Sequence, residues 1–291
     1  MDKVSKKDCD RLIKNDWKEV KVALHTGQVN YSEIDKLLEY RFFKQYNDMF
    51  SLMEFDNTVE LSSIQKLARG VRGWYYDNGD KFDYERFIPK IKYSGLNRFN
   101  PPEKIFIYLG INSNNKELSE EKVCIKELRA NRGDKVSLCE FVVNNSALNK
   151  RVVDLTIGND STYEELINNI NRIIDYANIS NDLNKKLGNF KKNDKEFVNQ
   201  SIRAKKGPEY KIAKELMKIY TKMITDDLFK AVDGLDRQYE YAPFHAFANY
   251  FQQKGYTGII YNSTVSPENR NLVLFDISDV NPIGKIKNIE V

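Results

Sequence analysis

The chain has 291 residues, of which 41% are hydrophobic and 30% are charged, and its mean hydropathy is −0.60. Its 16 phenylalanines and 17 tyrosines supply enough apolar area for a core, which excludes wholesale disorder. The net charge of +4 comes from 46 basic and 42 acidic residues, and so small an excess does not favour a protein dedicated to nucleic acid.

Cysteine and histidine are scarce. Cys9, Cys124 and Cys139 are widely spaced and odd in number, so they predict neither a disulfide framework nor a metal site. The only histidines are His25 and His245, too few for a histidine zinc site, and His245 lies in an aromatic-rich helix where packing is the expected role. Since no signal peptide or long apolar run is found, we expect a cytoplasmic protein without a membrane span.

The first third of the chain predicts helices. Apolar residues recur at near-helical spacing over 9–24, and a second such pattern runs over 32–53. A third helix is expected to begin at Ser62 or Ser63. The turn signal at residues 78–79 then sets the end of a helical N-terminal module, residues 1–79.

After residue 80, short strand-like runs alternate with helices. The candidate strands are 105–109, 135–143, 151–155, 256–261 and 272–276. The candidate helices are 119–131, a helix opened by a capping box at 161–164, a long amphipathic helix from Pro208 to about Gly234, and a helix between Pro243 and Gly255. This pattern predicts an α+β catalytic domain over 80–291 with a helical insertion at about 159–240.

A polar segment at 184–207 is rich in lysine. A solvated loop is the favoured interpretation. A phosphate or nucleic-acid patch is the alternative, supported by few aromatics, since only Phe190 and Phe197 could stack on bases.

Polar residues stand at the edges of two strand-like runs far apart in the sequence. Arg98 precedes Asn100-Pro101-Pro102, whose prolines stiffen the backbone and direct the guanidinium, as suits phosphate recognition. Tyr108 ends the first run, where its ring can stack on a base. Taken singly, a surface arginine and a core tyrosine are the more common interpretations.

Glu127 is more informative because it lies on or beside the apolar stripe of its helix, where an unpaired carboxylate is costly. Such an acid has either a structural basic partner or a catalytic role, and the residues alone leave both open. Ser263 follows the apolar run 258–261, and Asn271 opens the next run. Both are also compatible with ordinary turn and loop roles.

Together these segments resemble the RES-domain family, which is named for a motif arginine, glutamate and serine. The resemblance rests on Arg98-Phe99-Asn100-Pro101-Pro102, Tyr108, Glu127, Gly258-Ile259-Ile260-Tyr261-Asn262-Ser263 and Asn271-Leu272-Val273-Leu274-Phe275. It covers roughly residues 80 to 291. It implies an ADP-ribosyltransferase-like fold and an enzyme that breaks NAD⁺ at the nicotinamide–ribose bond, by hydrolysis or phosphorolysis, as toxins of toxin–antitoxin systems do.

The resemblance also implies site residues. The catalytic residues are expected to be Arg98, Glu127 and Ser263, and the substrate-binding residues Tyr108, Asn100 and Asn271. Arg98 would clamp the pyrophosphate, while Glu127 would hydrogen-bond the ribose and stabilise a developing oxocarbenium ion. Glu121 competes with Glu127, and Ser266 with Ser263, for these roles. NAD⁺ would be the substrate, with no cofactor and no metal.

Two other functions stay open. An ADP-ribosyltransferase would attach part of NAD⁺ to a macromolecule, and a non-catalytic module would bind nucleic acid in a salt-sensitive way without turnover. We expect a toxin or antiphage effector as the biological role. The N-terminal helices could bind an antitoxin or other inhibitor, gate the cleft or drive homo-oligomerisation, and the sequence does not choose among these.

Overall fold

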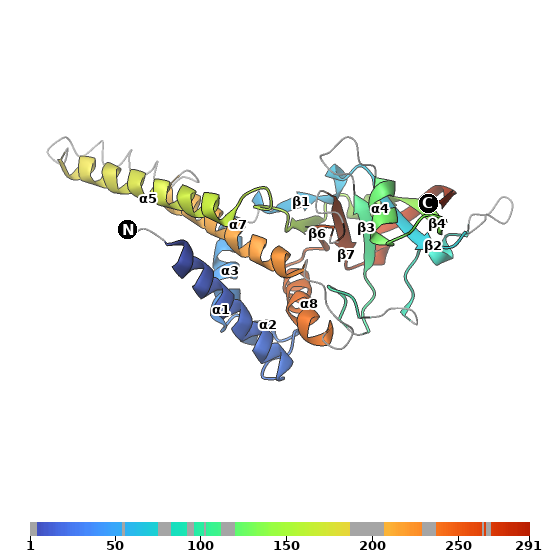
Figure 1. Cartoon of the computed structure of the whole chain (residues 1–291), viewed down its shortest axis with the longest axis horizontal. Coiled ribbons are helices and arrows are strands. Elements are labelled where there is room, and N and C mark those ends of the chain that lie inside the picture. The colour runs from blue at the N-terminus through green and yellow to red at the C-terminus, as the bar shows by residue number, and fades with distance from the viewer. Residues whose placement is uncertain are drawn as a thin grey trace. The chain divides into compact units, whose positions relative to one another are not determined.

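The computed structural model describes residues 5–53, 56–74, 83–91, 96–101, 103–111, 120–186, 207–228, 237–263, 265 and 269–291, with side chains described outside 6–12 and 179–186. The chain divides into two compact units. Unit 1 comprises Met1–Val20, Asp35–Asp56 and Ile157–Ile224, and unit 2 comprises Lys21–Ile34, Asn57–Thr156 and Thr225–Val291. Figure 1 shows the elements along the chain.

Unit 1 is helical. It contains most of α1 (Lys6–His25), α3 (Arg41–Leu52), α5 (Tyr163–Lys186) and most of α7 (Pro208–Leu228), together with part of the short α2 (Ile34–Leu37). Its core is aromatic, since the ring of Phe42 packs 4.8 Å from that of Trp17 and 5.0 Å from that of Tyr220. The single helix predicted over 32–53 is two helices in the structure, α2 and α3, separated by a turn.

Helix α5 begins with a capping box, one residue later than predicted. The Thr162 hydroxyl accepts the backbone N–H of Glu165 at 3.2 Å, and the Glu165 carboxylate accepts the backbone N–H of Thr162 at 2.7 Å. These reciprocal bonds satisfy two donors at the helix start. They also hold the pKa of Glu165 below its ordinary value.

Unit 2 is built on an eight-stranded sheet with the order β1-β5-β6-β7-β3-β2-β4-β8. The strands are β1 (Thr58–Glu60), β2 (Leu67–Arg72), β3 (Ile107–Ile111), β4 (Lys135–Val143), β5 (Arg151–Asp154), β6 (Gly258–Asn262), β7 (Arg270–Leu274) and β8 (Val280–Glu290). β5 and β6 pair in parallel, and the other neighbours pair antiparallel. Helices α4 (Glu120–Glu127) and α8 (Arg237–Gln253) complete the regular elements, and the predicted mixture of helices and sheet is confirmed.

The helix predicted after Ser62 or Ser63 is wrong. A short 3₁₀ turn, Leu61–Ser63, leads instead into β2. Apolar positions in this segment fit either period over so short a run, and pairing with β4 over the whole of β2 decides for a strand. The expected module boundary at residue 79 consequently does not coincide with a boundary of the compact units, because β1 and β2 belong to the sheet of unit 2.

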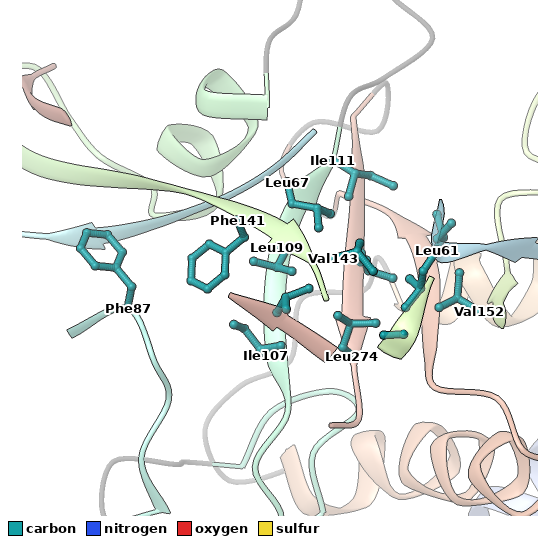
Figure 2. Packing of buried hydrophobic residues seen from close by; sticks show 14 of the residues in the cluster. Leu61, Leu67, Phe87, Ile107, Leu109, Ile111, Phe141, Val143, Val152 and Leu274 are labelled. Atoms are coloured by element: carbon teal, nitrogen blue, oxygen red, sulfur yellow. The ribbon is translucent and has the colours of Figure 1, made fainter. Parts of the chain in front are cut away.

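The main core of unit 2 lies on one face of the sheet. Figure 2 shows side chains from β2, β3, β4 and β7 gathered there, including Leu67, Leu109, Phe141 and Leu274, with Phe87 beside them. All five are at most 3% exposed. Burial of this kind stabilises the sheet by roughly 1.5–3 kcal/mol for each large side chain.

Helix α8 begins earlier than predicted. Pro243 was expected at its start, yet the helix begins at Arg237 and contains Pro243. Proline has no N–H, so the Tyr239 carbonyl receives no helical bond from residue 243. The other end agrees with the prediction, since Gly255 has φ +85° and the backbone N–H groups of Gly255 and Tyr256 close a Schellman motif.

Several predictions lie outside the described residues, namely the turn at 78–79, Ser266 and nearly all of the Lys-rich segment. The first residues of that segment, 184–186, form the end of α5. Within the described part of the chain, no helix is both long and apolar enough to cross a bilayer.

Gly258 permits the close approach of β6 and β7, and its replacement should break that pairing. A Cβ atom there would lie 2.3 Å from the Val273 carbonyl oxygen and 2.9 Å from Leu274 Cδ2. We expect Gly258→Ala to lower the free energy of unfolding by about 3 kcal/mol, measured by urea denaturation. The control is Gly255→Ala, where no atom lies within 4 Å and only the positive φ costs about 1–2 kcal/mol. Equal effects would contradict the steric argument.

Candidate functional site

Unit 2 contains a cavity of about 510 Å³, called the site cavity below. Its wall is formed by β2, β3, β6, β7, the end of α4, the start of α8 and residues 96–98. Its polar lining includes Arg69, Arg98, Tyr108, Glu127, Tyr261 and Asn271. An adjoining cavity of about 840 Å³ shares Arg69, Gly70, Asn97, Tyr108 and Leu128 with it. Four of the six expected site residues therefore meet in the site cavity.

Glu127 is the last residue of α4 and is half-buried. A Schellman motif ends the helix, because the N–H of Arg129 bonds to the Lys126 carbonyl and the N–H of Ala130 to the Ile125 carbonyl. Asn271 Nδ2 donates to Glu127 Oε1 at 2.5 Å. Asn271 is itself 4% exposed within β7. The carboxylate is thus held in a defined direction by a buried strand residue.

Side-chain alternation brings Tyr261 to the same place. Tyr261 of β6 pairs with Asn271 of β7, whereas their neighbours Ile260 and Leu272 enter the main core. A hydrogen bond joins Tyr261 and Asn271. Burial, with Tyr108 and Glu127 nearby, raises the pKa of Tyr261 well above its ordinary value. The hydroxyl therefore stays protonated near neutral pH and can donate.

Tyr108 fastens the loop that carries Arg98. Its hydroxyl accepts the backbone N–H of Phe99 at 3.2 Å, and burial raises the pKa of this phenol. The fully buried Phe99 ring packs 5.2 Å from the ring of Tyr261. These contacts, together with the predicted stiffening by proline, hold Arg98 at the cavity, where its guanidinium carbon lies 5.7 Å from the centre of the Tyr241 ring.

Two expected residues do not line the site cavity. Asn100 lines the adjoining cavity, and its side-chain amide donates to the Lys104 carbonyl at 3.1 Å, which closes the loop after Arg98. Ser263 is fully buried, and its hydroxyl accepts the backbone N–H of Val265 at 3.2 Å. Each side chain therefore stabilises the loop in which it stands and does not line the site cavity.

The structure places the two candidate acids, Glu127 and Glu121, in different surroundings. Glu127 lines the site cavity, whereas the half-buried Glu121 accepts a hydrogen bond from Lys287 Nζ at 2.7 Å. Of these two residues, only Glu127 faces the cavity.

Arg69 lines the site cavity but was not among the expected site residues, and the same holds for Arg237, Tyr241 and Tyr261. β2 and β3 pair only at Leu67↔Ile111 and Ala68↔Gly110, and Arg69 follows where the strands separate. Its Nη1 lies 3.5 Å from the Tyr108 carbonyl oxygen, and it lines both cavities. Burial lowers its pKa to about 10, so it remains cationic at neutral pH. If residues 67–72 had been assigned to a strand, Arg69 would have stood out as an arginine among apolar strand residues.

His245 is a buried packing residue, as the sequence predicted. It is 3% exposed, and its Nε2 lies 2.9 Å from the carbonyl oxygen of Asn97, a residue that lines both cavities. A carbonyl only accepts, so Nε2 carries the hydrogen. Burial lowers the pKa of His245 below 6.5, which keeps the ring neutral at pH 7.

The depressed pKa of His245 predicts a loss of stability on acidification. The unfolded chain binds a proton below about pH 6.5, whereas the folded chain resists protonation until its lower pKa is reached. We expect the thermal midpoint to fall between pH 7.5 and 5.5. His245→Gln, which can still donate to Asn97 and does not titrate, should reduce this slope. An unchanged slope in the variant would show that other groups cause it.

The lining of the site cavity indicates the kind of ligand that it suits. A mixed α/β unit brings a carboxylate, three tyrosines and three arginines to one cavity, which suits an anionic ligand rich in hydroxyl groups. A family model described as RES domain matches residues 207–287. The match covers less than half of the chain and supports the family resemblance that the motifs indicated. The match includes α7, α8, β6, β7 and most of β8, with Tyr241, Tyr261 and Asn271, whereas Arg98 and Glu127 precede it.

No curated protein and no solved structure matches the chain.

Proposed function

We propose that the chain is an NAD⁺-consuming enzyme that cleaves the nicotinamide–ribose bond, built on an ADP-ribosyltransferase-like RES domain. The observation that carries this proposal is the contact between Glu127 and Asn271 in a cavity that also contains Arg98 and Arg69. The RES-domain match supports an enzyme that acts on NAD⁺ and a toxin-like role. We further propose that the protein is a cytoplasmic toxin or antiphage effector whose activity is blocked by an inhibitor protein.

The chemistry needs a fixed negative charge beside the reacting sugar. When the bond from C1 of the ribose to the nicotinamide nitrogen breaks, both electrons leave with nicotinamide, and positive charge develops on the ribose. A carboxylate held by Asn271 stabilises that charge without reorganising during the reaction. Glu127 is therefore proposed to act on the ribose.

The anionic half of the substrate needs cations. Arg98 and Arg69 both line the site cavity, and a guanidinium can bind phosphate oxygens in pairs. Arg69 also lines the adjoining cavity, which gives a dinucleotide room to extend past Tyr108. We propose that the two arginines bind the pyrophosphate and that Tyr108 packs near the nicotinamide ribose. Asn100 and Ser263 are proposed to act indirectly, by shaping the neighbouring loops.

The decisive experiment incubates the protein with NAD⁺, with and without phosphate, and identifies products by mass. With water the products are nicotinamide, ADP-ribose and a proton, whereas with phosphate they are nicotinamide and ADP-ribose 1-phosphate. Label from NAD⁺ that stays attached to a macromolecule would instead indicate ADP-ribosyl transfer. Salt-sensitive nucleic-acid binding without any NAD⁺ turnover would contradict the proposal and favour a binding module.

Glu127→Gln should remove most of the activity. The amide keeps the size of the side chain but not the charge, so we expect kcat for NAD⁺ consumption to fall about 10²- to 10³-fold with a smaller change in KM. The control is Glu121→Gln, on the same helix but paired with Lys287 away from the cavity. Full activity in the Glu127 variant would remove the carboxylate from the mechanism.

Arg69→Met should weaken substrate binding. Loss of a charge-assisted hydrogen bond costs about 1.5–3 kcal/mol, so KM for NAD⁺ is expected to rise about 10- to 100-fold. Arg132, which is exposed, provides the matched control as Arg132→Met. If both variants bind NAD⁺ as the unmodified protein does, the pyrophosphate does not lie at Arg69.

A further inference from the structure

The start of α8 supplies two side chains to the site cavity. Arg237 and Tyr241 both line it, and the ring of Tyr241 lies 5.7 Å from the guanidinium carbon of Arg98. Since these two residues are four apart, they share one face of the helix. The position of this first turn therefore sets the contact between the Tyr241 ring and the Arg98 guanidinium.

The other side of the same turn is held by a buried lysine. Lys21 lies near the end of α1, in the part that belongs to unit 2, and is 9% exposed. Its Nζ contacts Asp227 Oδ2 at 3.2 Å and also bonds to Glu240 Oε2. It lies 5.4 Å from the centre of the Tyr239 ring, against which His25 packs at 4.4 Å.

The lysine remains charged in this position. Burial lowers the pKa of Lys21, but its hydrogen bonds to Glu240 and Asp227 and their charges together raise it above the ordinary value. The ammonium therefore joins the end of α7, through Asp227, to the start of α8, through Glu240.

The first turn of α8 depends on this external support more than an ordinary helix start does. Pro243 cannot donate a hydrogen bond, so the backbone bond that would tie the Tyr239 carbonyl to the next turn is missing. The residues that contact Lys21, Tyr239 and Glu240, stand immediately before Tyr241. A shift of this segment would move Tyr241 away from Arg98.

We propose that Lys21 is a positioning residue that sets the substrate affinity of the site cavity through the first turn of α8. The inference rests on the proposed function, because the affinity concerned is that for NAD⁺. Lys21 does not line the cavity and acts through Glu240 on Tyr241 and, through Tyr241, on Arg98.

The first test compares steady-state NAD⁺ consumption by Lys21→Met and Lys21→Arg. We expect Lys21→Met to raise KM about tenfold with less than a twofold change in kcat, and Lys21→Arg to restore most of the affinity. Lys18→Met removes one charge from an exposed position of the same helix and should change neither constant. A folded Lys21→Met protein with unchanged KM would overturn the proposal.

Lys21→Met leaves two acidic side chains without their cation, so the variant could fail to fold. Glu240→Gln avoids this problem because Glu240 is 25% exposed and the pair of Lys21 with Asp227 is kept. We expect KM to rise in the same direction, about threefold. Loss of kcat at constant KM in either variant would indicate a general structural role and contradict positioning.

The closing experiment separates this proposal from the proposed function. In a Tyr241→Ala background, Lys21→Met should raise KM no further, since its route to the cavity is already removed. Amide hydrogen exchange of residues 241, 242 and 244, whose N–H groups lie beyond the four unbonded donors of the helix start, should be faster in Lys21→Met than in Lys21→Arg or Lys18→Met. If the unmodified protein consumes no NAD⁺, the proposed function fails. The exchange rates then decide whether Lys21 holds α8, and equal rates would overturn that claim.

Discussion

The pairing of β6 with β7 is the constraint on which both the core and the candidate site depend. The two strands approach so closely at Gly258 that no side chain fits there, and from that point their residues alternate between two faces. One face gives Ile260 and Leu272 to the main core, and the other gives Tyr261 and Asn271 to the site cavity. Asn271 then orients Glu127, so the position of the carboxylate follows from a backbone register.

The cavity exists because neighbouring elements stop pairing at this point. β2 and β3 separate after two residue pairs, and Arg69 lies in the opening. The loop with Arg98 enters from the side and is fastened by Tyr108 and Phe99, while α8 brings Tyr241. Glu127 is therefore held by Asn271, and the loop of Arg98 by Tyr108 and Phe99, so uncharged neighbours keep these charges in place.

Much of this arrangement could be predicted from the sequence where local signals are strong. Long helices with clear periodicity and strands such as Lys135–Val143 follow from their patterns, and Arg98, Tyr108, Glu127 and Asn271 were expected to act together. Strands β2 and β8 were not predicted, and for the same reason. β2 and β8 owe their conformation to pairing with β4, which no local window contains. Arg69 was missed with β2, and the turn-like role of Ser263 depends on a hydrogen bond to a residue beyond the strand.

The order of the strands in the sheet differs from their order along the chain, and this has a consequence for biosynthesis. β6 and β7 stand between β5 and β3 in the sheet, yet more than a hundred residues, including the helices α5, α7 and α8, separate β5 from β6 in sequence. A nascent chain that has reached only residue 250 has the acid of α4 and the arginines of β2 and the following loop, but not the strands that bring them together. The cavity can close only after Leu274 has been translated, so an unfinished polypeptide does not contain an assembled site.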